Sequence, residues 1–244
     1  MATREQPDAI VIGAGQNGLA CACYLARAGL RVLVLEAAET IGGMTLTAEA
    51  TLPGFWSDIH ASGYQLANFS PAPAELDLTQ HGLELIVPDN VYAHTFPNGR
   101  SIVVSRDLER SVAAIARFSA RDAATFRALV EDYRQGRASF IDAFFSPPAT
   151  PTINGDRFRA ATLSLRSWAD DTFERDEVKA LFGGFAAFVG AAPDDAGGAE
   201  IARLFGVVLQ TEGNNFVRGG MNSVTRALAA DLAAHGGAIQ TSCR

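Results

Sequence analysis

Short apolar runs and a helical pattern alternate at the start of the chain. Ala9 to Ile12 is an uninterrupted apolar run that stops at Gly13, which predicts a buried parallel strand leading into a turn. Mostly small or apolar residues from Leu19 to Ala28 predict a helix, and Gly29 is typical of the position after a helix C-terminus. Val32 to Leu35 is a second apolar run. This stretch therefore predicts a strand, a turn, a helix and a second strand.

The middle of the chain has short strand patterns followed by longer helical ones. Pro97-Asn98-Gly99 contains the turn residues of a hairpin. Asp107 is placed to cap one helix, and Ser119 with Asp122 resembles a capping box that starts the next. The predicted strands are Leu83 to Val87, Tyr92 to Phe96 and Ser101 to Val104, and the predicted helices end at Phe118 and Phe145 or span Leu165 to Phe173, Asp176 to Val189 and Glu200 to Leu209. This region therefore predicts a small sheet with several helices. After it, Asn222 is expected to cap a helix to His235, and Ala238 to Thr241 predicts a last strand.

Three glycines lie in the predicted turn between the first strand and the first helix. Gly13 allows a tight turn, Gly15 lets the backbone approach a pyrophosphate, and Gly18 lets the helix pack closely on the strand. The free amide groups of the helix start favour a diphosphate without a basic side chain. Glu36 ends the second strand, where its carboxylate can bind both hydroxyls of an adenosine ribose and repel a 2′-phosphate. The combination predicts a dinucleotide site.

A glycine pair, Gly42-Gly43, follows shortly after Glu36 and gives further backbone room beside the diphosphate. The run from Asp8 to Gly43 resembles the extended FAD fingerprint of the phytoene desaturase-like flavoproteins, within the amine oxidase superfamily. Met44 stands where that pattern often has arginine, so no charged contact is expected there. The resemblance implies FAD as the cofactor. The expected cofactor-binding residues are Gly13, Ala14, Gly15, Gln16, Asn17, Gly18, Glu36, Ala37, Gly42, Gly43 and Met44.

The resemblance continues in two later segments. Pro53 to His60 is similar to the family segment that returns toward the flavin, and Asn215 to Met221 is similar to its proline-arginine-glycine-glycine-methionine motif, with Val217 in place of the proline. The implied fold class is α/β, a Rossmann-like FAD-binding parallel sheet with an inserted α+β substrate-side domain. The corresponding domains are residues 1–66 and 218–244 for the sheet and residues 67–217 for the insert.

The implied function is an FAD-dependent oxidoreductase that oxidises a small apolar or amine-like substrate by hydride transfer to flavin. Three alternatives stay open: a flavin amine oxidase, an NAD-dependent dehydrogenase with a coincidental glycine pair, and a binding protein like the Rab GDP-dissociation inhibitors, which share the fold without a flavin. Glu36 and Gly42-Gly43 disfavour the last of these.

Charge, apolar runs and cysteines exclude several classes. The 244 residues include 20 basic and 27 acidic ones, a net charge of −7 that argues against nucleic acid as a partner. The N-terminus lacks the apolar core of a secretion signal, and no run approaches the length of a membrane helix, so we expect a cytoplasmic protein without an integral membrane segment. Cys21 and Cys23 are two apart on a helix and face different sides, unlike the redox pair of flavoprotein disulfide reductases.

Catalytic residues cannot be assigned from the pattern, because the flavin itself carries hydride chemistry. His60 is the best single candidate, although an ordinary hydrogen-bonded histidine is the alternative, and Arg218 is expected at the cofactor, at a polar substrate group or in an ion pair. The four histidines lack metal-ligand spacing. The residues expected either in a substrate tunnel or in the core are Phe140, Phe144, Phe145, Phe182, Phe185 and Phe188.

The family resemblance also implies further sequence of comparable length after this chain. The chain is therefore expected to be the N-terminal half of such a flavoprotein, with the C-terminal half absent, whether as a gene fragment, a trimmed polypeptide or a split subunit completed by a second chain. Without the covering half, we expect weak or no activity from the chain alone.

Overall fold

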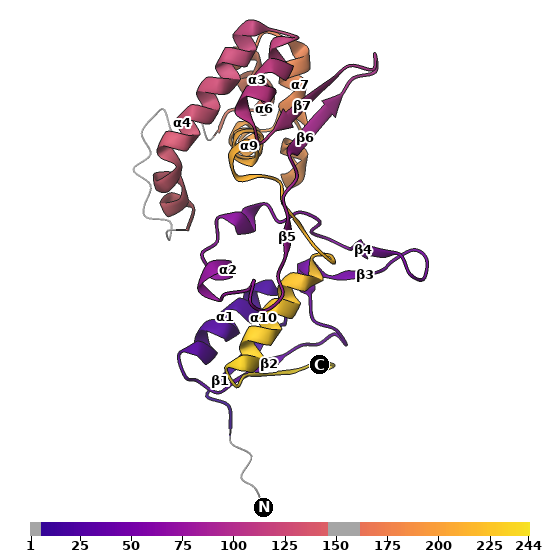
Figure 1. The fold of residues 1–244 in the computed structure, drawn as a ribbon, viewed down its shortest axis with the longest axis vertical. Helices are drawn as coiled ribbons and strands as arrows, with labels where there is room; N and C mark the ends of the chain where they lie inside the picture. Colours follow the sequence, from indigo (N-terminus) through magenta and orange to yellow (C-terminus); the bar gives the residue numbers. More distant parts are fainter. Residues whose placement is uncertain (1–5, 146–161) are drawn as a thin grey trace, which may run out of the picture. The chain divides into compact units, whose positions relative to one another are not determined.

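The computed structural model describes residues 6–145 and 162–244, and these residues form two compact units (Figure 1). The first unit is discontinuous in sequence and contains the described residues up to Val87 together with Asn215–Arg244. The second unit, Pro88–Asn214, is the continuous segment between them. Residues 67–87 thus belong to the first unit by their contacts, and the three-segment domain division remains a prediction.

A three-stranded parallel sheet organises the first unit. Its strands β1 (Ala9–Ile12), β2 (Val32–Leu35) and β9 (Ala238–Gln240) follow the order β1-β2-β9. Val34 at the centre pairs with Val11 on one side and with Ile239 on the other. The predicted α/β class with a parallel sheet is confirmed.

Two helices, α1 (Gln16–Arg27) and α10 (Asn222–Ala234), lie side by side and cover one face of this sheet (Figure 1). Val32 and Val34 point into that face and are buried, because the strand alternates its side chains between the two faces. The opposite face is open: Ile10 is 56% exposed and Ile12 88% exposed. Parallel sheets are normally covered on both faces, so the open face is an exposed apolar surface.

A buried carboxylate joins the two helices of the first unit. Asp231 on α10 has a fully buried side chain and accepts hydrogen bonds from Arg27 on α1, with an Nη2–Oδ1 distance of 2.6 Å. His81 and His235 also place a ring nitrogen 3.3 and 3.4 Å from Asp231 Oδ1. Burial by itself raises the pKa of Asp231, but hydrogen bonds from Arg27 and then Cys23 outweigh it and hold the pKa below its ordinary value.

Smaller elements complete the first unit. A hairpin of β3 (Thr47–Glu49) and β4 (Trp56–Asp58) follows the glycine pair, and no strand was expected there. Strand β5 (Leu85–Ile86) pairs with β8 (Phe216–Val217), which brings the late glycine-rich segment back to the first unit. The other elements are the 3-10 turns η1 (Gly43–Thr45) and η2 (Leu66–Asn68) and the short helix α2 (Ala72–Glu75).

The second unit packs helices against one antiparallel hairpin. The hairpin is β6 (Asn90–Thr95) and β7 (Ser101–Ser105), as the Pro97-Asn98-Gly99 turn predicts. Phe126, Phe173 and Phe182 are fully buried in its core. Its helical elements are α3 (Leu108–Ala116), α4 (Ala120–Phe145), α6 (Leu165–Thr172), α7 (Asp176–Gly183), η3 (Ala186–Val189), α8 (Gly198–Arg203), η4 (Leu204–Val208) and α9 (Leu209–Glu212).

Helix starts were predicted with mixed success. Asp107 caps α3 as expected, because its side chain accepts from the amide of Glu109 at 2.9 Å. Ser119 accepts from the amide of Asp122, but the Asp122 carboxylate binds two later amides instead of closing the capping box. The cap expected at Asn222 is wrong, because that residue is the first of α10 and Met221 precedes it as the cap.

Two helices are more irregular than predicted. The single helix expected from Asp176 to Val189 is two pieces, because α7 ends at Gly183 and the chain continues as the 3-10 turn η3. The helix expected from Glu200 to Leu209 starts at Gly198, widens into π-helical geometry in η4 and continues as α9.

Candidate flavin site

The glycine turn after β1 has the close contacts that its sequence predicts. Gly13 has a φ of +99°, and its amide donates to Leu35 O at 2.7 Å, which ties the turn to β2. A Cβ at Gly18 would lie 2.1 Å from Gly13 O, so only glycine allows α1 to start this close to the strand. The first turn of α1 has Gly15 as its cap, without a side-chain hydrogen bond. Its amides therefore face outward without a capping side chain.

The glycine pair lies directly against this turn. The Gly42 amide donates to Ala14 O at 3.1 Å, and Gly42 forms a parallel bridge with Gly15. A Cβ on Gly43 would lie 3.1 Å from the Cα of Gly15, and Gly43 has a φ of +55°. Two backbone segments thus meet with no side chain between them. We call Gly13–Gly18 together with Gly42-Gly43 the glycine cradle.

Glu36 is held at the end of β2 by backbone amides. Its two carboxylate oxygens accept from Ala14 N at 2.7 Å and from Ala38 N at 2.9 Å. These hydrogen bonds, that of Ala38 first and that of Ala14 second, hold the pKa of Glu36 below its ordinary value. The carboxylate is therefore charged, oriented and beside the cradle, with lone pairs left for further donors.

The other expected cofactor-binding residues surround the same turn. Gln16 and Asn17 form the first turn of α1, and Ala37 follows Glu36. Met44, next to the glycine pair, is 58% exposed and brings no charge. The structure thus gathers all the expected residues in one place, and their contact with a cofactor remains a prediction.

The start of α10 also supports the cradle, which the sequence did not indicate. The Asn222 Oδ1 atom lies 3.2 Å from where a Cβ on Gly42 would be, and the Asn222 amide donates to Thr47 Oγ1 at 2.9 Å. The Met221 amide donates to Asp58 Oδ1 at 2.8 Å. The β3–β4 hairpin thus caps α10 and fixes it against the glycine pair.

The contacts of the two candidate catalytic residues, His60 and Arg218, do not indicate a catalytic role. His60 is exposed, and within residues 6–145 and 162–244 it makes no hydrogen bond. Arg218 forms an exposed ion pair with Glu84, with an Nε–Oε1 distance of 2.7 Å, which was one of its three expected roles.

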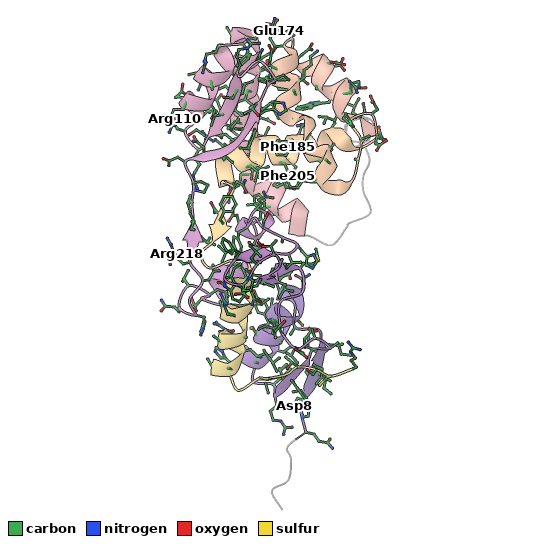
Figure 2. The ribbon with its side chains drawn as sticks, turned by 90° about the vertical axis from the view of Figure 1, so that its right-hand side faces the viewer. Asp8, Arg110, Glu174, Phe185, Phe205 and Arg218 are labelled. Carbon is green, nitrogen blue, oxygen red and sulfur yellow. The ribbon has the colours of Figure 1, made fainter. Side chains whose placement is uncertain are left out.

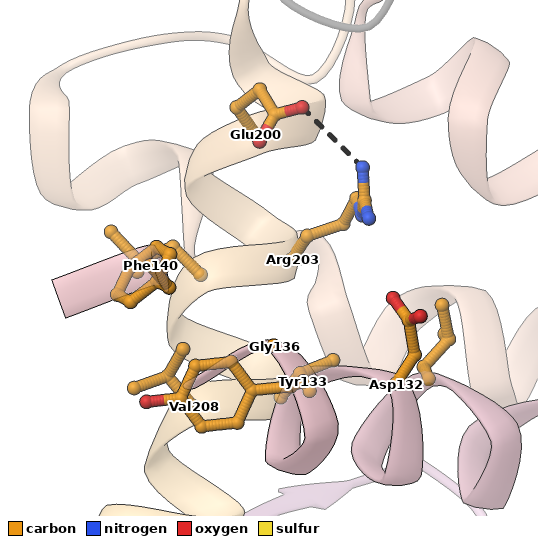
Figure 3. Close-up of a pocket in the computed structure, with 10 residues that line it drawn as sticks. Asp132, Tyr133, Gly136, Phe140, Glu200, Arg203 and Val208 are labelled. Carbon is orange, nitrogen blue, oxygen red and sulfur yellow. Dashed lines mark hydrogen bonds and ion pairs between the residues drawn. The ribbon is translucent and has the colours of Figure 1, made fainter. Parts of the chain in front are cut away.

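The expected tunnel phenylalanines have different environments. Phe182 and Phe185 are buried core residues, and Phe185 stacks on Phe205 with ring centroids 6.1 Å apart (Figure 2). Phe188 is 60% exposed, and Phe140 lines a cavity of the second unit (Figure 3). The side chains of Phe144 and Phe145 lie outside the described residues.

The described part of the chain also bears on metal ligands, cysteine pairs and membrane-spanning helices. Its His, Cys, Asp and Glu residues contain no group of three that could hold a metal ion. Cys21 is exposed and Cys23 buried, so the two thiols face different sides of α1 as predicted, and neither forms a disulfide. Among the same residues, every helix is too short or too polar to cross a membrane.

The family model of the flavin-containing amine oxidoreductases matches residues 18–244. Hydroxyneurosporene desaturase of Rhodobacter capsulatus is 31% identical over 245 residues, which are 93% of this chain and 47% of that protein. A limonene dehydrogenase subunit from Castellaniella defragrans is 38% identical over 135 residues, 55% of this chain and 24% of that protein.

A solved structure has the same fold. Wild-type putrescine oxidase bound to putrescine superimposes with a TM-score of 0.61 at 20% identity, covering 97% of this chain and 51% of that one. At this identity the likeness concerns the fold alone. The chain spans about half the length of the desaturase and of the oxidase.

Proposed function

The chain belongs to the flavin-containing amine oxidoreductase family. We therefore propose that it binds FAD and forms the cofactor-binding part of an oxidoreductase. The observation that carries the proposal is the glycine cradle with Glu36 at its edge. Gly15 and Gly43 approach so closely that a Cβ on Gly43 would be 3.1 Å from the Gly15 Cα. Such an approach leaves two stretches of bare backbone beside one helix start, which suits a diphosphate.

Glu36 and the glycine cradle have separate roles in this proposal. The Glu36 carboxylate accepts from the ribose hydroxyls of the adenosine, since its oxygens keep free lone pairs after binding Ala14 and Ala38. Its charge repels a 2′-phosphate. The first-turn amides of α1 receive the diphosphate, and Gly42-Gly43 keep the opposite side free of side chains.

The bound flavin supplies the acceptor for a hydride from substrate carbon. The family and the named relatives favour an apolar or amine-like small molecule as the substrate. Among the described residues we assign none to catalysis, since His60 makes no hydrogen bond and Arg218 is paired with Glu84. The residues of this chain would then bind and orient the cofactor.

The open face of the sheet supports a second polypeptide segment as a partner. β1 lies at the edge of the sheet, and its exposed Ile10 and Ile12 belong to the uncovered face. The relatives are about twice as long as the matched part, so they contain sequence that has no counterpart here. We propose that polypeptide of this kind covers the face, from the same or from another chain, and that full activity requires it.

FAD binding to the purified chain tests the function. We expect flavin absorption in the purified or FAD-supplemented protein, and FAD as the nucleotide released on heating. Replacing the carboxylate in Glu36→Gln should weaken FAD binding about 10- to 100-fold, because charge-assisted hydrogen bonds to the ribose are lost. Glu39→Gln is the matched control, since Glu39 is exposed three residues later and makes no hydrogen bond among the described residues.

Four results would contradict the proposal or part of it. Equal FAD affinities of the two glutamine variants would remove Glu36 from the site. Binding of NAD in place of any flavin would favour the dehydrogenase, and a colourless protein that binds neither would favour the non-flavin binding protein. Full flavin occupancy with substrate turnover by this chain alone would refute the need for a covering segment.

A further inference from the structure

The side chains of Thr47 and Asp58 bind the start of α10 from the β3–β4 hairpin, which lies beside it (Figure 1). The two residues are direct partners in the antiparallel pair, and Thr47 donates from Oγ1 to Asp58 Oδ1 at 2.6 Å. The same hydroxyl accepts from the amide of Asn222 at 2.9 Å, and the same carboxylate oxygen accepts from the amide of Met221 at 2.8 Å. Each side chain thus binds the other and one amide of the helix start.

Gly220 allows the helix start to come this close to the hairpin. It has a φ of +88°, and a Cβ built on it would lie 2.6 Å from both Oγ1 and Cγ2 of Thr47 and 3.1 Å from Asp58 Oδ1. The Thr47 side chain is short and stiff, so it cannot turn away from an added methyl group. The hairpin and the helix start therefore meet in one arrangement, which depends on bare backbone at Gly220.

Asn222 connects the helix start to the glycine pair. Its Oδ1 accepts from Thr225 Oγ1 at 2.8 Å, and Thr225 is fully buried, so the carboxamide is fixed on α10. The same Oδ1 lies 3.2 Å from where a Cβ on Gly42 would be, and Gly42 in turn forms the parallel bridge with Gly15. Because close-packed groups transmit displacements, a shift of the helix start moves Gly42 and with it one side of the glycine cradle.

Thr47 and Asp58 lie outside the glycine cradle and act on it only through α10. A binding site keeps its geometry when hydrogen bonds behind it fix the groups that touch the ligand. We propose that Thr47 and Asp58 are positioning residues of the FAD site, which hold Gly42 in place through the start of α10. This role rests on the proposed function, in which the cradle receives the diphosphate. FAD binding must in turn strengthen the two hydrogen bonds to the helix start, because coupling between two sites is reciprocal.

The FAD affinity of hairpin variants of the full chain, measured by flavin fluorescence, tests this role. Thr47→Val replaces the hydroxyl with a methyl group of similar size and should weaken FAD binding about tenfold, whereas Thr47→Ser should restore most of the affinity. Asp58→Leu and Asp58→Asn form the corresponding pair, because only asparagine keeps an oxygen for the two donors. Ser57→Ala is the matched control, since Ser57 is exposed in the same hairpin and its side chain makes no hydrogen bond among the described residues.

Hydrogen exchange of single amides distinguishes this role from a purely structural one. In the wild-type chain, saturating FAD should slow exchange at the amides of Met221 and Asn222, which the two side chains bind. The amide of Gly54 donates to Glu49 Oε1 at 2.9 Å at the tip of the same hairpin, and its exchange should not change. In Thr47→Val the slowing at Asn222 should disappear, because the acceptor of that amide is gone.

The possible results separate this role from FAD binding itself. Equal FAD affinities of folded Thr47→Val and Thr47→Ser variants would overturn the positioning role and leave the proposed function intact. Exchange at Met221 and Asn222 that does not respond to FAD would do the same, and this measurement needs only the wild-type chain. A wild-type chain that binds no FAD would refute the proposed function, and the positioning role with it.

Discussion

Gly18 offers the sharpest test of how the first unit is built. Replacing it with alanine adds one methyl group at the start of α1, where the new Cβ would lie 2.1 Å from the carbonyl oxygen of Gly13. It would also be 3.5 Å from Val11 Cγ1. The obstacle is backbone, which cannot rotate away as a side chain does. The helix must therefore move away from β1.

The size of the effect follows from two opposing terms. Real Cβ atoms almost never come within 3.0 Å of another heavy atom, so the helix start must shift by most of an ångström. Overpacking of this kind costs about 1–3 kcal/mol, and here the upper end applies because backbone is the neighbour. The second term has the opposite sign, because alanine is about 1 kcal/mol more favourable than glycine inside a helix. We expect Gly18→Ala to lower the free energy of unfolding of the first unit by about 2 kcal/mol, about 30-fold in the unfolding equilibrium constant.

Labelling of the Cys23 thiol during urea unfolding measures this change in the first unit alone. Cys23 is buried and donates to Leu228 O at 3.2 Å, so it becomes reactive when α1 leaves α10. Replacing Cys21 and Cys243 with serine leaves Cys23 as the single thiol. The labelling rate against urea then gives the opening free energy.

Gly136→Ala is the matched control, because it makes the same change inside a helix where the new methyl group meets nothing within 4 Å. It should stabilise the second unit by up to about 1 kcal/mol, as reported by the fluorescence of buried Trp168 in a Trp56→Phe background. Opposite signs for the two alanines are the expected result. An unchanged or raised stability of Gly18→Ala would refute the argument from close packing.

The buried ion pair and the buried thiol give two further predictions. Asp231→Ala should cost about 3 kcal/mol, because it leaves the Arg27 guanidinium with two backbone carbonyls and the exposed, more distant carboxylate of Asp77 at 3.9 Å. Since the folded pKa of Asp231 lies below the unfolded value of about 3.9, its contribution is present above that pH and is lost as the pH falls through the folded value. The difference in urea midpoint between wild type and variant should therefore shrink in acid, and a constant difference would contradict this. Burial raises the pKa of the Cys23 thiol to about 12, so a thiol reagent at neutral pH should label Cys21 at once and Cys23 only on unfolding; equal rates would contradict it.

The sequence predicted best where local pattern and turn chemistry agree. The segment from β1 to β2 has an apolar run, a glycine turn and a helical pattern in succession, and each signal is contained within a few residues. The β6–β7 hairpin was also predicted from local signals, because Gly99, with a φ of +78°, occupies the turn that the neighbouring residues indicate. Local signals were sufficient there.

The prediction of a helix cap failed where side chains distant in sequence bind the backbone amides at the helix start. Asn222 resembles a helix cap, yet its own amide binds Thr47 and the preceding amide of Met221 binds Asp58. Those partners lie 175 and 163 positions away, and they make a local cap unnecessary. A helix-capping rule considers only neighbours in sequence, so it assigned the cap to the wrong residue.

The sequence indicated the residues of the candidate site, whose contact with a cofactor remains a prediction, but it did not indicate the contacts that hold them in place. The spacing of Gly13, Gly15 and Gly18 and the acid at Glu36 were visible in the sequence. The bridge between Gly15 and Gly42 and the packing of Asn222 beside Gly42 depend on the folded chain. The buried Asp231 pair was also hidden, because Arg27 lies 204 positions away.

The pairing of β2 with β9 sets an order of events during synthesis. Leu33 pairs with Ala238, so these three strands cannot all pair until the residues of β9 have left the ribosome. The second unit is continuous from Pro88 to Asn214 and can fold earlier, since all its contacts are already available. Until then the N-terminal β-α-β segment, with its apolar strands, lacks its partners β9 and α10. It is therefore the part of this protein that a chaperone would have to protect.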